Sequence, residues 1–151
     1  MEEDIVVREQ AEQEILHLLN RLFLFLDERR YDDLATLFAP DGCWHRQGHL
    51  LRGHDAIIEA LSARSATMRI CHVITNGIVE ASGEGRAEAQ CVMTAYRHDD
   101  GTSTQAVPEI AGPAVMARVR TRLARLPEGW RIEEMTMDYL FHFAAPLRAA
   151  A

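Results

Sequence analysis

The sequence predicts an α+β domain in which helices pack on one face of a curved, mostly antiparallel sheet. Segments with helical features lie between residues 8 and 64, and four long segments of alternating polarity lie between residues 68 and 143. Tight turn sequences separate those four segments, which is typical of consecutive antiparallel strands. Helices followed by a run of strands is the element order of the α+β class.

Residues 8–28 are expected to form the first helix, because apolar side chains recur there at helical spacing. They are Ile15, Leu18, Leu19, Leu22 and Leu26. A neighbouring line along the same helix holds Leu16, Asn20, Phe23 and Asp27. Asp27 is therefore expected on the same side as Phe23, one turn further along the helix.

Two shorter helices and a hairpin are expected next. Residues 31–38 predict a helix that ends before the Pro40-Asp41-Gly42 turn. Residues 43–51 predict two short strands that turn near Gln47-Gly48. Residues 53–64 predict the third helix. Its apolar face is made by Ala56, Ile57, Ala60 and Leu61.

The four long strands follow at residues 68–81, at 86–98, within 114–126 and at 130–143. Side chains alternate between the two faces of a strand, so each face can be assigned. On the first long strand one face is expected to carry Met68, Ile70, His72, Ile74, Asn76 and Ile78. On the last strand one face is expected to carry Met135, Met137, Tyr139, Phe141 and Phe143, with His142 facing solvent.

Two polar residues stand where apolar ones are expected. Asp27 closes the apolar run of residues 22–26, and His72 lies on the apolar face of the first long strand. A carboxylate and an imidazole that both face a core must satisfy each other or take part in chemistry. An Asp that fixes the tautomer of a His is a common way to make a general base near neutral pH.

Composition limits the class of protein. The 151 residues, 17.0 kDa in mass, fit one domain that spans residues 1–151. A net charge of −7 argues against nucleic-acid binding, and no apolar run approaches the roughly 20 residues that span a bilayer. The acidic start differs from a signal peptide, and the three cysteines have no C-x-x-C spacing. We therefore expect a cytoplasmic protein that binds neither nucleic acid nor membrane.

Other polar clusters indicate less specific roles. His45, His49 and His54 lie four and five residues apart, which matches no standard zinc pattern, so no metal site is expected. The alternating arginines of the third long strand are expected on the outer face of the sheet. They are Arg118, Arg120 and Arg122. Together with an exposed Leu140 they lead us to expect a homo-oligomer, either a dimer or a trimer.

Four segments of the chain resemble the SnoaL-like branch of the NTF2-like superfamily, an α+β cone. They are residues 26–34, 37–42, 52–57 and 71–76, and with the order of elements the resemblance covers nearly the whole chain. It implies a deep, mostly apolar pocket between helices and sheet. The superfamily hosts dehydratases, isomerases, dehydrochlorinases, epoxide hydrolases and binding proteins without chemistry, so the fold alone does not give the activity.

Two enzymes of the superfamily, scytalone dehydratase and the hexachlorocyclohexane dehydrochlorinase, carry an Asp near the end of the first helix and a His early in the first long strand. Asp27 and His72 occupy those places. The resemblance implies that His72 removes a proton and that Asp27 orients it. The tyrosines by which scytalone dehydratase activates a water are matched most nearly by Leu26 and Arg46, which cannot act in the same way.

The predicted function is that of a dehydratase-like lyase or isomerase, which would need no metal or organic cofactor. Its substrate is expected to be a hydrophobic cyclic or polyketide-like molecule. His98 is the nearest match to a second histidine of scytalone dehydratase. The residues expected to contact the substrate are Phe23, Tyr31, Asn76, Tyr96, His98 and Tyr139.

A second interpretation comes from residues 26–31, which also resemble the β subunits of aromatic-ring-hydroxylating dioxygenases. Those subunits share the fold, hold an assembly together and carry no catalytic centre. A ligand-binding protein without chemistry is a third interpretation. A pocket filled by side chains would favour the subunit, whereas an open pocket would favour an enzyme or a binding protein.

Overall fold

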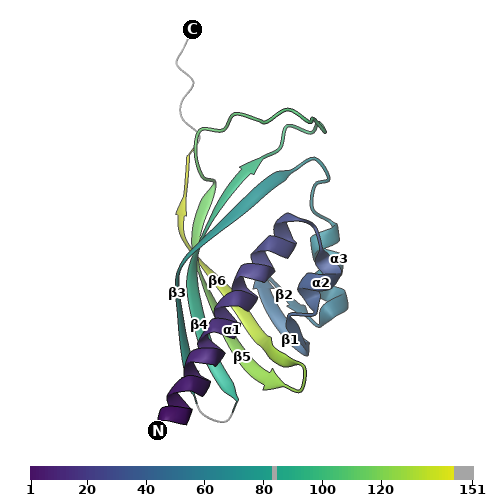
Figure 1. Cartoon of the computed structure of the whole chain (residues 1–151). Coiled ribbons are helices and arrows are strands. Elements are labelled where there is room, and N and C mark those ends of the chain that lie inside the picture. The colour runs from purple at the N-terminus through teal and green to yellow at the C-terminus, as the bar shows by residue number, and fades with distance from the viewer. Residues whose placement is uncertain (83–84, 145–151) are drawn as a thin grey trace.

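Figure 1 shows the computed structural model, in which three helices lie along one side of a single curved sheet. The structure describes residues 1–82 and 85–144. The helices are α1 (Glu2–Asp27), α2 (Tyr31–Ala35) and α3 (His54–Ser62). None of these described helices is both long and apolar enough to cross a membrane.

The sheet has six strands in the order β2-β1-β6-β5-β4-β3. Their bounds are β1 Phe38–Arg46, β2 His49–Arg52, β3 Arg69–Ser82, β4 Arg86–His98, β5 Val115–Leu126 and β6 Gly129–His142. β3 to β6 form the predicted antiparallel meander, and β1 joins it by pairing parallel to β6. β1 and β2 form the predicted hairpin. The α+β class is therefore confirmed.

The first helix begins at Glu2 rather than at residue 8 as predicted. Acidic side chains occupy its first turn, where they interact favourably with the positive end of the helix dipole. Val6 and Val7 remain exposed in this part of the helix. The apolar periodicity starts only where α1 reaches the sheet, which is why periodicity alone placed the start too late.

The end of α1 places Asp27 beside β3. Arg29 adopts a left-handed conformation, with φ of 59°. Its N–H donates to Leu26 O (3.4 Å), and the Arg30 N–H donates to Phe25 O (2.8 Å). This is the Schellman pattern, formed here without a glycine. The helix therefore stops immediately after Asp27, whose side chain projects from its last turn.

The second helix ends at Ala35 and not at Phe38 as predicted. Phe38 instead begins β1, where it pairs with Ile132 of β6. Its ring stacks on that of Trp44 at a centroid distance of 6.1 Å. Both aromatic residues are fully buried, and this tertiary packing overrides the local helical preference.

The hydrophobic core lies between α1 and the face of the sheet that α1 covers. Its largest contributors from α1 are Ile15, Leu19, Leu22 and Phe23. The helix comes especially close to β3 at Gly77, where a Cβ atom would lie 2.7 Å from Leu16 Cδ2. A side chain at this position would therefore require the end of Leu16 to move.

An irregularity in β3 reverses the predicted faces in its second half. The pairing with β4 shifts between Thr75 and Ile78, and Asn76 has a positive φ of 55°. Asn76 is exposed, and Ile78 is 52% exposed. The prediction that both share the apolar face of His72 is wrong, because a bulge adds a residue and inverts the alternation beyond it.

A second irregularity does the same in β6. Tyr139 pairs with Ala117 but Phe141 pairs with Met116, so Leu140 is an extra residue. Phe141 and Phe143 were predicted to share the face of Tyr139. They do not, and both are exposed. His142 is exposed as predicted, yet its ring stacks on Tyr139 at 5.1 Å.

Candidate active site

The last turn of α1 and the first half of β3 bring Asp27 and His72 together. His72 Nδ1 lies 2.5 Å from Asp27 Oδ1, and the backbone N–H of His72 donates to Asp27 Oδ2 (2.8 Å). Both carboxylate oxygens therefore contact the same residue. This two-point contact holds the imidazole in one orientation relative to the helix.

The contact also selects the tautomer of His72. A carboxylate only accepts hydrogen bonds, so Nδ1 must carry the proton that lies between the two groups. In the neutral ring, Nε2 is then left with a free lone pair. Among residues 1–82 and 85–144, no group forms a hydrogen bond with Nε2. His72 is thus arranged to accept a proton at Nε2.

The dyad is largely withdrawn from bulk water. The side chain of His72 is 7% exposed and that of Asp27 is 18% exposed. The ring of Phe23 lies against the imidazole, with a centroid distance of 5.3 Å. Phe23 is itself fully buried, so it supports the dyad from behind. A poorly solvated site strengthens the charge interaction between Asp27 and a protonated His72.

His72 lines a cavity of about 400 Å³ between the helices and the sheet. Its walls come from the end of α1, from α3 and the segment after it, and from β1, β3, β4, β5 and β6. The apolar side chains of the wall include Leu26, Met68, Ile70, Met93, Val115 and Met137. Polar side chains make up the rest of the wall, and a concave site that combines apolar and polar groups can hold a small molecule.

Polar groups gather at the cavity beyond the dyad. Arg46, Arg64 and Arg97 line it, as does Tyr139. Arg64 Nη1 donates to the Tyr31 hydroxyl (3.1 Å) and to Leu26 O (2.9 Å). Burial and the nearby charge of Arg64 lower the pKa of Arg46 from its ordinary value. The cavity therefore holds a local excess of positive charge.

The structure divides the predicted contact residues into two groups. Tyr139 lines the cavity, Phe23 packs on His72, and Tyr31 reaches the cavity through Arg64. Asn76, Tyr96 and His98 are not among the lining residues. They lie on other parts of the sheet surface, so the structure does not bring them to the dyad.

The register of β4 explains the position of Tyr96 and His98. Tyr96 pairs with Cys71 and His98 with Arg69, and these partners alternate with His72 along β3. Cross-strand partners share a face, so both side chains lie opposite to the face of His72. His98 faces Asp100 there, with 3.7 Å between Nε2 and Oδ2. The residues of β4 that line the cavity have the opposite parity and lie on the face of His72. They are Met93, Ala95 and Arg97.

Arg64 and Arg97 were not predicted as site residues. Arg64 follows α3, and its hydrogen bonds to Leu26 O at the end of α1 and to the Tyr31 hydroxyl place its guanidinium at the cavity. Arg97 could have been found from the alternation of β4, because it pairs with Ile70 on the face of His72. Arg46, at the end of β1, also lines the cavity.

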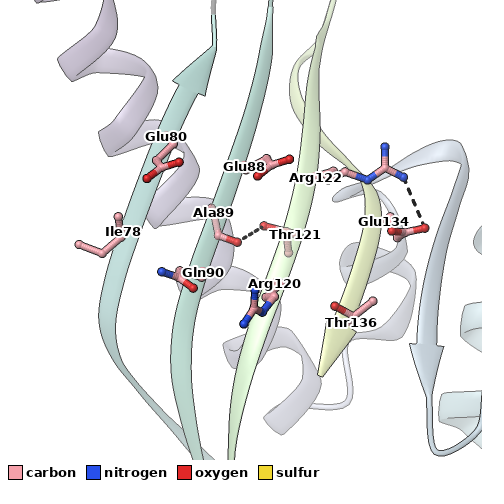
Figure 2. A pocket seen from close by; sticks show the side chains of 10 residues that line it. All are labelled: Ile78, Glu80, Glu88, Ala89, Gln90, Arg120, Thr121, Arg122, Glu134 and Thr136. Atoms are coloured by element: carbon pink, nitrogen blue, oxygen red, sulfur yellow. Dashed lines mark hydrogen bonds and ion pairs between the residues drawn. The ribbon is translucent and has the colours of Figure 1, made fainter. Parts of the chain in front are cut away.

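A second hollow, of about 410 Å³, lies on the opposite face of the sheet. Figure 2 shows its side chains, which project from neighbouring strands with α1 behind the sheet. Its arginines are paired with carboxylates, Arg122 with Glu134 (3.4 Å) and Arg120 with Asp138 (3.2 Å). Arg122 is also the main cause of the lowered pKa of Glu134. Glu80 and Glu88 also line this hollow, but no histidine is among its described lining residues. It is therefore a weaker candidate than the His72 cavity for chemistry that uses an imidazole base.

One group of described side chains has donor atoms close enough to hold a metal ion. It consists of Cys43, His45 and Glu134, whose donor atoms lie within 4.8 Å of one another. Arg122 already contacts Glu134, so a cation would compete with that guanidinium. Of the three histidines considered from the sequence, only His45 belongs to this group. His54 Nε2 instead lies 2.8 Å from Phe38 O.

Comparison with solved structures supports the fold. An NTF2-like protein with a cystatin-like fold from Novosphingobium aromaticivorans matches with a TM-score of 0.76 and 21% identity, over 93% of this chain and 89% of that one. A protein of the same species that is provisionally named an aromatic ring hydroxylase gives 0.74 and 21%, over 91% and 94%. One provisionally named a scytalone dehydratase gives 0.72 and 19%, over 100% of both chains. At these identities the likeness shows the fold alone.

No curated protein matches the chain. The family model of the SnoaL-like domain matches residues 8–136, which is most of the sequence. This range contains Asp27, His72 and the arginines that line the cavity. The chain therefore belongs to the SnoaL-like domain family.

Proposed function

We propose that this protein is a cofactor-independent lyase or isomerase of the dehydratase type, acting on a hydrophobic cyclic or polyketide-like molecule. The observation that carries the proposal is the Asp27–His72 contact, which leaves Nε2 of a buried imidazole without a described partner at a cavity of about 400 Å³. The family includes polyketide cyclases and dehydratases, which is consistent with this chemistry.

In the proposed reaction His72 Nε2 removes a proton from a carbon next to a carbonyl group. The electron pair of the broken C–H bond forms an enolate, and the ring becomes an imidazolium. Asp27 stabilises that positive charge through the Nδ1–H contact. In an elimination, the C–O bond of a β-hydroxyl then breaks, and Nε2 returns the proton to the departing oxygen as water forms. In an isomerisation, the proton returns to a different carbon.

Tyr139 is a candidate to hydrogen-bond the developing oxyanion, because it lines the same cavity as His72. A donor aimed at the charge that develops in the transition state is a large source of rate enhancement. A bound hydrophobic substrate that covers the apolar part of the wall would displace water and strengthen such contacts. An open cavity of this size also favours an enzyme or a binding protein over a subunit whose pocket is filled by side chains.

Deuterium exchange tests proton abstraction without knowledge of the natural substrate. Cyclic ketones such as 2-tetralone are incubated with the protein in D₂O, and incorporation at the carbons next to the carbonyl is followed by mass spectrometry. We expect exchange above the buffer rate for at least one ketone, and loss of that exchange in a folded His72→Ala variant. Equal exchange by the two proteins would refute the proposal and favour a protein that only binds its ligand.

A further inference from the structure

The cavity that contains His72 carries positive charge without a matching acid. Arg46, Arg64 and Arg97 line it, and no Asp or Glu is among the described residues that do. Asp27 lies behind the imidazole, and both of its oxygens are engaged by His72. An arginine-rich wall without carboxylates differs sharply from the outer face of the sheet.

Arg46 is the clearest unpaired cation of the cavity. It ends β1, is half-buried, and its guanidinium lies 5.8 Å from the ring centroid of Trp44. Its one hydrogen bond to a described residue is a long contact with Gln47 Oε1 (3.4 Å). No carboxylate in the described part of the chain forms an ion pair with it. A half-buried guanidinium with so few partners retains most of its donor capacity.

Arg64 is held beside it by neutral groups. Its Nη1 donates to Leu26 O and to the Tyr31 hydroxyl, and its guanidinium lies 5.8 Å from the Tyr31 ring centroid. These contacts fix the position of the guanidinium but do not neutralise its charge. No described residue accepts a hydrogen bond from Nε or Nη2. The remaining donors are therefore available for a ligand.

The arginines on the outer surface provide the internal comparison. Arg120, Arg122 and Arg125 each contact a carboxylate, at 3.2, 3.4 and 3.0 Å. These exposed guanidiniums are thus paired with acids, whereas Arg46 and Arg64 have no carboxylate partner in the described part of the chain. Two like charges near one another in a partly dry site raise the free energy of the empty pocket, and an anion would relieve that cost. Burial and the nearby charge of Arg64 also lower the pKa of Arg46.

We propose that Arg46 and Arg64 form a binding site for a carboxylate on the substrate. This assignment rests on the proposed function, in that it takes the cavity of His72 to be the substrate site. Guanidinium groups bind carboxylates with charge-assisted, often bidentate, hydrogen bonds. The apolar wall would receive the ring system while the arginines hold the acid. The substrate class is therefore narrowed to hydrophobic cyclic acids.

A binding experiment tests the site independently of catalysis. Titration calorimetry compares 2-naphthoate with its neutral amide, 2-naphthamide, which has the same ring system and nearly the same shape. We expect the native protein to bind the naphthoate at least about tenfold more tightly, as one charge-assisted contact can provide. Arg46→Gln should remove most of that preference while leaving the binding of the amide unchanged.

Arg120→Gln is the matched control, because it removes an arginine from the outer face, and it should keep the full preference. Arg64→Gln gives a second reading, with thermal unfolding measured in parallel because Arg64 also binds Leu26 O. Equal binding of the two compounds, no binding of either up to about 10 mM, or an unchanged preference in Arg46→Gln would overturn the assignment.

The outcome is separable from that of the proposed function. A folded His72→Ala variant should keep the preference for the naphthoate, since the imidazole is not part of the anion site. Preference for the acid without His72-dependent deuterium exchange would uphold the anion site and reject proton abstraction. Exchange that depends on His72, without any preference for the acid, would do the reverse.

Discussion

Replacement of Asp27 by Asn tests how the carboxylate controls the tautomer of His72. The native carboxylate accepts two hydrogen bonds from His72, at Nδ1 (2.5 Å) and at the backbone N–H (2.8 Å). An amide of the same shape has one acceptor and one donor end. If its oxygen faces Nδ1, its NH₂ group opposes the backbone N–H. If it is flipped, the NH₂ group faces Nδ1 and forces the ring proton to Nε2.

Either orientation weakens the site, but in different ways. The first leaves a largely buried backbone N–H unsatisfied, which costs about 1–3 kcal/mol of stability. The second removes the lone pair from Nε2 and with it the general base. We expect Asp27→Asn to lower the rate of proton abstraction by about 10²–10⁴, the range for loss of a positioned base or of its orienting carboxylate.

The assay for Asp27→Asn is deuterium incorporation into the cyclic ketone that the native protein exchanges fastest. Circular dichroism and thermal unfolding establish that the variant is folded. Asp138→Asn is the matched control, because Asp138 pairs with Arg120 on the outer face of the sheet and its side chain is 61% exposed. A folded Asp27→Asn protein with native exchange would refute the orienting role of the carboxylate.

Three further results are expected. The double variant Asp27→Asn/His72→Ala should exchange ketone protons no more slowly than the worse single variant, because the pair acts as a unit; independent, multiplying losses would contradict this. Gly77→Ala should lower the free energy of unfolding by about 1–3 kcal/mol, because the new Cβ would lie 2.7 Å from Leu16 Cδ2. In denaturant titrations, adding Leu16→Ala should restore part of that loss. An unchanged free energy of unfolding in Gly77→Ala would show that the contact relaxes without cost. Light scattering at micromolar concentration should report a dimer or trimer, because Leu140, Phe141 and Phe143 are exposed near the end of β6, and a particle of 17.0 kDa would count against it.

Much of the fold could be predicted because its elements follow regular periods. The strand at residues 86–98 has the predicted bounds, since continuous alternation and two turn sequences delimit it. The approach of Asp27 to His72 could also be anticipated. It depends only on the helical line through Phe23 and on alternation in the first half of β3, both of which are regular there.

The failures occur where a single residue interrupts a period. Asn76 and Leu140 each add one residue to a strand, and every side chain beyond them changes face. The Asn76-Gly77 sequence could have marked the first bulge, because glycine inside a strand often accompanies a bulge and Asn tolerates a positive φ. Leu140 carries no such signal. Arg64 was missed for another reason. Arg64 enters the cavity from a segment after α3, and its place depends on tertiary packing alone.

The central claim is that Asp27 holds His72 as the Nδ1–H tautomer with a bare Nε2 at the cavity. Nitrogen NMR of protein labelled with ¹⁵N-histidine reads this directly, with His72→Ala used to assign the signals. For the neutral form of His72 we predict a proton on Nδ1 and none on Nε2, and the reversed tautomer or a mixture in Asp27→Asn. A native His72 with its proton on Nε2 would contradict the account, because that nitrogen could not accept a proton from a substrate.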